Sequence, residues 1–493
     1  MSDFRALLFV VGLLLTVFAL LMLLPALFGV SSGHWEYFLT ASAITLFVGG
    51  AMVLAGRGSG LRPGFRGAFL VTSASWVAVA AASALPLTIG GWSYTDAFFE
   101  AMSGLTTTGS TVLVGLDDMD HPILIWRSLL QWVGGLGIVV MGILILPFLR
   151  VGGMQLFHTE SSERSEKVVS RTTQLVAYTS SIYAALTGVC FLAFSAGGMG
   201  AFDAFNHAMT TLSTGGFSTH DASFAHFESP LLETIATVFM LAGALPFVLY
   251  IKVVRGSARS LVNDQQVRGL LYLLLFAIAV LAIWLYGHGH PLGEALRFAS
   301  FNVVSLVTTT GFASSDYVAW GAFPVSVMIL LMLTGGTTGS TSGSIKIFRL
   351  QVLLATVGEQ FRRMIYPHAV VPRRYNGTKL TDDVVFSIIA FIVAYVLSIA
   401  AVAAALSFFG LDIITAFTGA ATAIGNVGPG FGNIIGPVGT FTTLPDGAKW
   451  ILAAGMLLGR LELFTVLVLF SPAYWIDAER GRLPQRASWH RTR

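Results

Sequence analysis

Charged residues and cysteine are both scarce in this chain of 493 residues. Only 11% of the residues are charged and 55% are hydrophobic, whereas soluble domains carry about 25% charged residues. This composition excludes an ordinary water-soluble protein. The single cysteine, Cys190, excludes an intramolecular disulfide and a cluster of metal-binding thiolates. Because Cys190 lies in an apolar run, we expect it to be a small buried side chain.

Catalytic and cofactor motifs are missing as well. The apolar runs contain no HExxH zinc motif, no nucleophile elbow and no converging pair of carboxylates. A glycine-rich stretch at 335–344 resembles a phosphate loop only superficially, because the Gly-Lys-Ser/Thr ending is absent. We therefore expect no enzymatic activity, no covalent cofactor and no nucleic-acid partner.

Long apolar runs, in contrast, recur along the whole chain. About 20 apolar residues suffice for a helix to cross a bilayer. Ten spans are predicted, at residues 4–30, 36–56, 67–90, 123–149, 174–196, 231–251, 269–287, 322–346, 383–409 and 449–475. The first is too long for a signal peptide and lacks a small-residue cleavage site, so we expect it to be retained. The sequence thus predicts an all-α polytopic membrane protein.

Four polar turns that contain glycine recur at intervals of about one hundred residues. Their matching glycines are 107, 95 and 117 residues apart, and they are Gly109, Gly216, Gly311 and Gly428. Each turn follows a helical segment half as long as a span, near 94–105, 201–212, 292–306 and 412–423. Because segments of that length can only enter the membrane and return, we predict four repeats of helix, pore loop and helix.

The predicted domains follow from these repeats and from an extra pair of helices that precedes them. They are 1–66 for the extra transmembrane pair, 67–172, 173–266 and 267–380 for pore repeats 1 to 3, and 381–493 for repeat 4 with a basic C-terminal tail. Repeat 3 includes 335–344 as an intramembrane loop.

Lys and Arg fall mainly on one side of these spans. Of the 28 basic residues, 24 lie in the termini and loops of one predicted side, which is normally the cytoplasmic side. The other four are Arg127, Arg297, Lys449 and Arg460. The turns then share the outer side and all repeats point the same way, unlike the inverted repeats of many secondary transporters. We therefore predict parallel repeats around one central pore, with both termini in the cytoplasm.

The turns are predicted to form a selectivity filter of backbone carbonyl groups. Carbonyl oxygens can replace the water shell of a cation, and glycine allows the positive φ that an inward-facing carbonyl often requires. The turns contain no Asp or Glu, which argues against a filter made of charged rings. The predicted filter residues are Thr107, Thr108, Gly109, Thr214, Gly215, Gly216, Thr309, Thr310, Gly311, Asn426, Val427 and Gly428. The alternative is that the turns are Thr/Gly-rich loops that only join helices.

Six short motifs, at residues 95–100, 105–109, 152–156, 215–223, 426–430 and 459–462, together resemble the Trk/Ktr/HKT superfamily of potassium transporters. The similarity runs from Arg5 to about Trp475 and is strongest to bacterial membrane subunits of the TrkH type. It implies potassium (K+) as the permeant ion, a bacterial inner membrane and a homodimer with one pore per protomer. It also implies a cytosolic nucleotide-binding regulatory subunit of the TrkA type, so nucleotide is expected only on that partner. The basic segment 346–379 could contact lipid headgroups or receive this subunit.

The same resemblance bears on selectivity. The superfamily's signature filter glycine falls on the four matching glycines, and in related plant transporters a serine at the first position accompanies sodium preference. Glycine at all four positions therefore favours potassium. The turns differ, however, because Gly215 precedes the second glycine and Asn426 and Val427 precede the fourth, which predicts an irregular ring. A sodium-permeable protein or a sodium-coupled potassium symporter stays open as the alternative.

A gate is predicted beneath the filter. The stretch 333–344 has four glycines and seven hydroxyl residues among twelve, so it cannot stay helical while it faces lipid. The superfamily supports a mobile intramembrane loop here that blocks the pore. Its predicted residues are Gly335, Gly336, Gly339, Ser340 and Gly343. The alternative is a packing kink made of small residues.

Arg460 is predicted to act with this loop. It lies eleven residues into a span that begins near Lys449, about 16 Å deep at 1.5 Å per residue. An arginine at that depth has to face a polar interior. We therefore place Arg460 on the pore wall, as a latch for the loop and an electrostatic barrier to cations. The alternative is a structural ion pair with Glu462 or another buried carboxylate.

Other polar residues receive plainer interpretations. Acidic residues in or near the half helices are expected to cap the positive ends of helix dipoles, and these are Asp96, Glu100, Asp203, Glu294 and Asp412. Four histidines show no common metal-ligand spacing and are expected to be loop or packing residues, namely His158, His207, His220 and His226.

Overall fold

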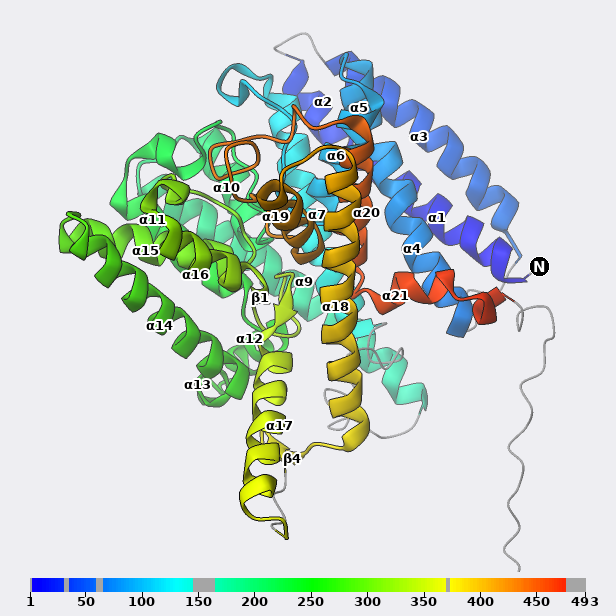
Figure 1. Cartoon of the computed structure of the whole chain (residues 1–493). Helices are drawn as coiled ribbons and strands as arrows, with labels where there is room; N and C mark the ends of the chain where they lie inside the picture. The colour runs from blue at the N-terminus through cyan, green and yellow to red at the C-terminus, as the bar shows by residue number, and fades with distance from the viewer. Residues whose placement is uncertain (1, 31–34, 59–64, 145–164, 369–372, 476–493) are drawn as a thin grey trace, which may run out of the picture.

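The computed structural model describes residues 2–30, 35–58, 65–144, 165–368 and 373–475. These residues are mostly helical, and their only strands are four of two residues each (Figure 1). The predicted all-α polytopic fold is confirmed. The motif at 152–156, His158 and the basic tail from residue 476 lie outside the described residues.

An extra group of helices precedes the repeats, and it comprises α1 (Ser2–Leu21), α2 (Leu23–Gly29) and α3 (Trp35–Gly56). Two glycines let the backbones of α1 and α3 touch. A Cβ on Gly12 would lie only 2.7 Å from the Gly49 carbonyl oxygen. Small residues at such contacts are typical of helices that associate in lipid.

Four units then follow, each with a long helix, a short pore helix, a turn and a second helical segment. Repeat 1 contains α4 (Phe65–Ser83), α5 (Leu85–Ile89), α6 (Tyr94–Leu105), η1 (Leu116–Asp118) and α7 (His121–Leu144). Repeat 2 contains α9 (Ser165–Ala196), α10 (Ala201–Leu212), η3 (Ser223–Phe227), α11 (Pro230–Gly243), α12 (Phe247–Val254) and α13 (Arg259–Asn263).

Repeats 3 and 4 also contain the short strands. Repeat 3 consists of α14 (Gln265–Gly287), α15 (Leu292–Val307), η4 (Tyr317–Trp320), α16 (Ala322–Met332), β1 (Thr334–Gly335), β2 (Ile345–Lys346) and α17 (Ile347–Ile365). An antiparallel hairpin of β3 (Arg374–Tyr375) and β4 (Thr378–Lys379) leads into repeat 4. Repeat 4 consists of α18 (Asp382–Phe408), α19 (Ile413–Gly425), α20 (Asp446–Arg460), α21 (Phe464–Leu467) and η5 (Val468–Phe470).

The four pore helices, α6, α10, α15 and α19, begin and end within two residues of the predicted half helices. Capping residues explain two of the starts. Ser93 Oγ accepts the Asp96 N–H at the start of α6, and the Asp412 carboxylate accepts the N–H groups of Ile414 and Thr415 at the start of α19. Hydrogen bonds from the Thr415 side chain and from these backbone groups lower the pKa of Asp412, so it stays ionised at the positive end of the helix dipole.

Seven helices in the described part of the chain are long and apolar enough to cross a membrane, and two bent pairs would make nine spans. Three of the ten predicted spans are broken by a sharp bend or run into a loop. The span 231–251 bends by 95° between α11 and α12, and 449–475 bends by 109° after α20. The span 322–346 is helical only as far as Met332. Pro246 accounts for the first break, because proline lacks an N–H and clashes with the preceding helical turn.

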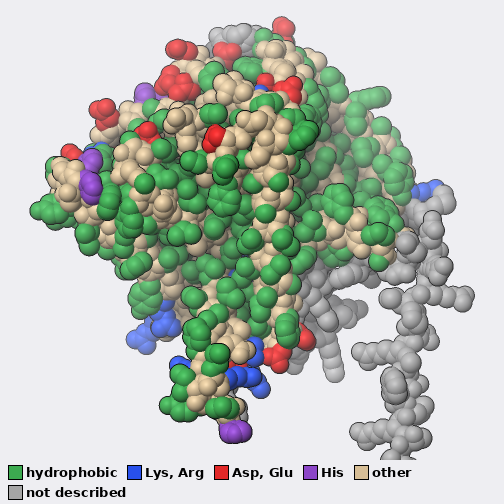
Figure 2. Space-filling view, viewed as in Figure 1, with side chains coloured by type: hydrophobic (Ala, Val, Ile, Leu, Met, Phe, Trp, Pro, Cys, Tyr) green, Lys and Arg blue, Asp and Glu red, His purple; other side chains and the backbone are tan. Residues whose placement is uncertain are grey.

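Charge is distributed unevenly over the surface. Figure 2 shows Lys and Arg gathered at the lower end, around α17, with acidic side chains concentrated at the upper end. Between them lies a broad band of mostly hydrophobic side chains. Large exposed apolar residues such as Phe47, Phe276 and Phe386 are expected where a protein faces lipid.

Candidate ion pore

The four pore helices end in the same hydrogen-bonded motif. In each repeat, the N–H of the residue before the matching glycine donates to the carbonyl five residues back, at 2.8 to 3.1 Å. The donor and acceptor residues are Thr108 and Ser103, Gly215 and Thr210, Thr310 and Ser305, and Val427 and Thr422. The preceding N–H donates to the carbonyl three residues back in every repeat. Together these bonds form a Schellman motif, which ends a helix at a residue in left-handed conformation.

That left-handed residue is not glycine in any of the four repeats. It is Thr107, Thr214, Thr309 or Asn426, with φ of 51°, 49°, 59° and 53°. The matching glycine two residues later also has a positive φ in each repeat, between 80° and 113°. A non-glycine residue in this conformation costs about 1–2 kcal/mol and persists only where its surroundings enforce it. Four equivalent turns therefore share one strained backbone conformation.

The matching glycines surround one narrow ring. A Cβ added to any of them would collide with, or press against, a carbonyl oxygen of another repeat. The contacts are Gly109 with Gly215 (2.1 Å), Gly216 with Thr310 (1.8 Å), Gly311 with Val427 (2.2 Å) and Gly428 with Thr108 (3.0 Å). Each glycine thus faces the carbonyl that precedes the matching glycine of the next repeat, and the fourth repeat closes on the first. The four turns meet at one depth around one passage.

Different side chains brace the turns of different repeats. In repeats 1 and 3, which lie opposite each other in the ring, two threonine hydroxyls share a hydrogen bond of 2.7 Å, Thr106 with Thr108 and Thr308 with Thr310. In repeat 4, the Asn426 amide donates to Thr108 Oγ1 of repeat 1 at 2.9 Å. The bracing of the ring therefore departs from fourfold symmetry, in line with the irregularity expected from the sequence.

Gln131 braces repeat 2 and was not singled out from the sequence. Its side-chain nitrogen donates to the Gly215 carbonyl at 2.6 Å, and its oxygen accepts the Phe217 N–H at 3.0 Å. Gln131 is fully buried on α7. The available signal was an uncharged polar side chain in the middle of an apolar span, where polar residues are costly unless they have partners.

Three of the four basic residues that were not assigned to the cytoplasmic side form ion pairs. These are Arg127 with Glu100 at 2.8 Å, Arg297 with Glu233 at 3.1 Å and Lys449 with Asp96 at 2.5 Å. Arg127 and Glu100 are both buried, and Arg127 also donates to the Ser218 carbonyl behind the turn of repeat 2. The expectation that Glu100 caps a helix is wrong, because it lies beyond the first turn of α6 and holds Arg127. These cations consequently add little net positive charge beside the passage.

The stretch 335–344 forms a loop rather than a kink in a helix. β1 and β2 pair in parallel, Thr334 with Ile345 and Gly335 with Lys346, and so close the loop at its base. The loop then fills the break between α11 and α12, where the Gly243 and Ala244 carbonyls accept the N–H groups of Thr341 and Thr337. Two interrupted segments thus satisfy each other's backbone groups, as irregular backbone inside a membrane requires.

The predicted loop residues occupy its closest contacts. A Cβ on Gly335 would lie 2.0 Å from the Gly343 carbonyl oxygen, and one on Gly343 would lie 2.1 Å from the Gly425 carbonyl oxygen. Gly336 packs against Ala244, and Gly339 has a φ of 80°. The Ser340 hydroxyl donates to Thr337 within the loop. Larger residues would not fit at several of these positions.

The loop touches the turns of three repeats from one side. The Thr214 hydroxyl donates to Thr341 Oγ1 at 3.1 Å, and the Gly343 N–H donates to Thr309 Oγ1 at 2.7 Å. The Ser344 N–H donates to the Gly425 carbonyl at 2.8 Å. The corresponding oxygens of Thr107 and Asn426 have no hydrogen-bond partner although they are buried. The loop thus lies directly against the ring and engages two of its four strained residues.

Arg460 meets the loop as expected from the sequence. Its guanidinium donates to the Thr341 carbonyl at 2.8 Å and to the Gly134 carbonyl at 3.4 Å, and it is buried. Glu462 pairs with Arg349 instead, at 2.5 Å, so the alternative pairing of Arg460 with Glu462 is not formed. The helix breaks immediately after Arg460, where Glu462 and Leu463 have positive φ values of 59° and 43°.

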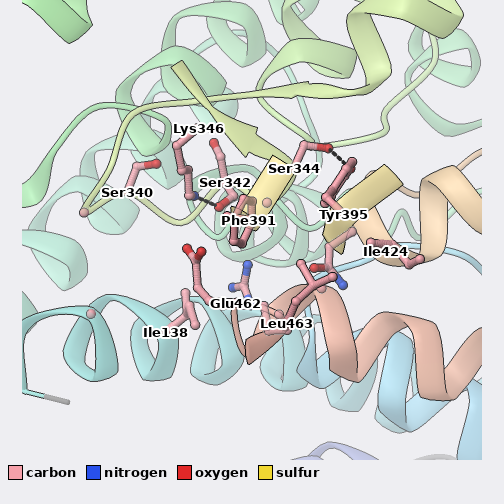
Figure 3. Close-up of a pocket in the computed structure, with 16 residues that line it drawn as sticks. Ile138, Ser340, Ser342, Ser344, Lys346, Phe391, Tyr395, Ile424, Glu462 and Leu463 are labelled. Atoms are coloured by element: carbon pink, nitrogen blue, oxygen red, sulfur yellow. Dashed lines mark hydrogen bonds between the residues drawn. The ribbon is translucent and has the colours of Figure 1, made fainter. Parts of the chain in front are cut away.

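Lys346 is a second cation beneath the ring. Its ammonium donates to the Ser342 carbonyl of the loop, and Figure 3 shows this bond beside Phe391 and Glu462. Lys346 and Arg349 were counted among the cytoplasmic charges, but both are buried. A small cavity of about 30 Å³ lies between Arg460, Glu462 and the loop. It has room for very few water molecules. Lys346 and residues of the loop also line this cavity.

The sequence was compared with models of known protein families. The model of the TrkH family, described as cation transport protein, matches residues 34–476. The chain belongs to the TrkH family of cation transport proteins. Members of the TrkH family are transporters, so the expectation that the chain is not an enzyme is confirmed. With its apolar spans, this TrkH-family chain is a multi-pass membrane protein.

Individual relatives of this TrkH-family chain agree with the assignment. It is 51% identical over 410 residues to the Trk system potassium uptake protein TrkI of Halomonas elongata, covering 83% of each chain. It is 35% identical to the Trk system potassium uptake protein TrkH of Escherichia coli K12, covering 96% of this chain and 99% of the relative. The crystal structure of the potassium transporter TrkH from Vibrio parahaemolyticus superposes with a TM-score of 0.88 at 34% identity, covering 96% and 99% of the two chains.

Proposed function

We propose that this chain takes up potassium across the bacterial inner membrane through a gated, channel-like pore with a backbone-carbonyl filter. The observation that carries the proposal is the closed ring of four strained turns, in which each glycine faces a carbonyl of the next repeat. Carbonyl oxygens arranged in this way can replace the hydration shell of a cation. The potassium uptake proteins among its relatives support potassium as the ion. The filter consists of the twelve turn residues named above.

The loop 335–344 is the gate in this proposal. It lies against the ring, and Arg460 and Lys346 each donate to one of its carbonyls. Both cations face the passage from the side opposite the outer mouth, where a positive charge repels a passing cation. The gate opens when the loop leaves the break between α11 and α12 and these bonds are released.

The remaining features of the proposal concern the whole assembly. The concentration of Lys and Arg around α17 (Figure 2) supports a cytoplasmic location for that end and for both termini. We propose the five-part division at residues 66, 172, 266 and 380, a homodimer with one pore per protomer, and regulation by a cytosolic nucleotide-binding subunit of the TrkA type. α17 projects from the rest of the molecule (Figure 1) and offers a surface for that subunit or for lipid headgroups.

Sodium permeation or sodium-coupled potassium transport is the alternative function. The observation that favours it is the uneven bracing of the ring, since Gln131 at the turn of repeat 2 and Asn426 in repeat 4 take the place of the Thr–Thr pairs of repeats 1 and 3. An uneven ring coordinates an ion of one size less uniformly.

Rubidium uptake into vesicles that contain the purified protein, with sodium as competitor, tests the proposal. We expect uptake that excess sodium reduces only slightly. Gly109→Ser should lower uptake and increase competition by sodium, because its Cβ would displace the Gly215 carbonyl. Gly293→Ser is the matched control, since a Cβ there meets nothing within 4 Å. Equal competition by sodium and rubidium in the unmodified protein would favour the alternative.

A further inference from the structure

Three side chains from two outer loops meet beside the mouth of the passage. Asp117 lies in η1 of repeat 1. In repeat 2, His220 precedes η3 and His226 lies within it. Their donor atoms all lie within 4.8 Å of one another. Asp117 Oδ1 is 2.5 Å from His220 Nδ1 and 3.6 Å from His226 Nδ1. This group could not be recognised from the sequence, because Asp117 is about one hundred residues from the two histidines.

We propose that Asp117, His220 and His226 bind a divalent transition-metal ion of the zinc class, and that the bound ion slows the access of cations to the pore. Two imidazoles and one carboxylate are a common ligand set for Zn²⁺, with a water molecule as the fourth ligand. Of the residues that the structure describes, this is the one group of three such side chains close enough to share an ion. The expectation that His220 and His226 are plain loop residues is revised accordingly.

The distances fit a tetrahedral ion after a small adjustment. Ligand atoms at about 2.0–2.2 Å from Zn²⁺ are roughly 3.3 Å apart, between the 2.5 Å and 3.6 Å found here. The two imidazole rings stack with their centroids 3.5 Å apart and an angle of 5° between their planes, so the lone pairs of their Nδ1 atoms lie in nearly parallel planes. One ring has to tilt for both to reach a single ion. His226 is 44% exposed and is free to do so.

The backbone around the three ligands is held in place by hydrogen bonds. The Asp221 carboxylate accepts the N–H groups of Gly115 and Leu116, which fixes the turn that carries Asp117. Asp117 Oδ2 in return accepts the Asp221 N–H at 3.3 Å. These bonds join the outer loops of repeats 1 and 2 whether or not an ion is bound. The ligands therefore do not depend on the ion to come together.

Asp203 adds an outer partner that zinc-binding histidines usually have. Its Oδ2 lies 3.5 Å from His220 Nε2, while its Oδ1 accepts the Thr219 hydroxyl at 2.7 Å. A carboxylate behind the far nitrogen of a ligating histidine orients the ring and places the proton on that nitrogen, which leaves Nδ1 for the ion. His220 Nε2 forms no hydrogen bond in this structure, so Asp203 has to move slightly closer to take this role.

The position of His220 connects the site with transport. A cavity of about 70 Å³ lies above the ring, and both His220 and the four matching glycines line it. A divalent cation held by His220 would raise the potential in this vestibule, and like charge repels an approaching monovalent cation. This second part of the proposal rests on the proposed pore function, whereas the metal site itself does not.

Isothermal titration of the purified protein with Zn²⁺ tests the site without any transport assay. We expect one ion per chain, with affinity reduced about 10- to 100-fold in Asp203→Asn and by at least as much in His226→Ala and Asp117→Asn. His288→Ala, which removes an exposed histidine of another loop, is the matched control and should bind normally. A single symmetric peak in size-exclusion chromatography verifies that each variant is folded. Unchanged binding in both His226→Ala and Asp117→Asn would overturn the site.

Rubidium uptake into vesicles with and without external Zn²⁺ tests the second part. We expect Zn²⁺ to slow uptake by the unmodified protein and by His288→Ala, and to have little effect on His226→Ala. Tight binding of Zn²⁺ without any slowing would overturn the link with transport. Absence of rubidium uptake even without Zn²⁺ would instead contradict the proposed function and leave the titration result standing.

Discussion

At the scale of single residues, side chains from other parts of the chain hold the turns that carry the four glycines of the ring. A glycine after a half-length helix is visible in the sequence, and all four lie in the ring. Gln131 bonds Gly215 of another repeat, so its role depends on a contact between distant parts of the chain. Lys346 bonds Ser342 only four residues away, but this contact forms only in the folded loop. The left-handed Thr107 and Asn426 were also hidden, because neither residue type requires that conformation.

Replacement of Gln131 tests whether its side chain sets the geometry of the ring. Gln131→Leu removes the donor to Gly215 and the acceptor for Phe217, and a buried polar group without a partner costs about 1–3 kcal/mol. We expect sodium to compete more strongly with rubidium uptake, with a smaller change in total uptake. The control is Ser128→Ala, because the Ser128 hydroxyl bonds only within α7. Unaltered sodium competition in Gln131→Leu would show that the brace is not needed for selectivity.

At the scale of elements, the pore helices were predicted more accurately than the spans. Their ends are marked by polar caps and glycine turns, which act locally. The breaks at 244–246 and 461–463 were not predicted. Pro246 marks the first one locally, but the loop satisfies the open carbonyls of Gly243 and Ala244 there, and Arg460 bonds the loop beside the second. Interruption of the second helix of repeat 3 was predicted, since a stretch with four glycines and seven hydroxyl residues among twelve cannot stay helical in lipid.

Weakening of the bonds that hold the loop is expected to open the gate. Arg460→Ala removes the bond to Thr341, and Lys346→Met removes the bond to Ser342. Each variant also removes a positive charge from the passage, so rubidium uptake should rise in both. Arg362→Ala provides a control with an exposed arginine on α17. Uptake at the unmodified level in both Arg460→Ala and Lys346→Met would contradict the role of the loop.

At the scale of the whole molecule, the charge distribution supports the proposed orientation after one correction. Lys346 and Arg349 are buried beneath the ring, which leaves 22 of the 28 basic residues on the predicted cytoplasmic side. Arg127, Arg297 and Lys449 lie outside the cytoplasmic side, but each is paired with a carboxylate. They therefore add little net positive charge to the outer side. The sequence could predict the orientation because it depends on loop charges, which need no knowledge of tertiary contacts.

Cysteine labelling in intact cells tests this orientation. The one natural cysteine, Cys190, is buried, so an introduced cysteine should be the main site of reaction. A membrane-impermeant maleimide should label His288→Cys in intact cells and Ser257→Cys only after the cells are permeabilised. Both positions are exposed. His288 directly follows the last residue of α14, whereas Ser257 lies between α12 and α13, which precede the first residue of α14. The reverse pattern would place the ring on the cytoplasmic side.

Anomalous diffraction from crystals grown in rubidium tests the central claim most directly. The four turns are proposed to coordinate a dehydrated cation with the carbonyl oxygens of Thr108, Gly215, Thr310 and Val427, which face the matching glycines. We predict an anomalous peak on the axis of the ring, within coordination distance of these oxygens, and its loss when sodium replaces rubidium. Rubidium bound elsewhere in the protein, with no peak in the ring, would contradict the account.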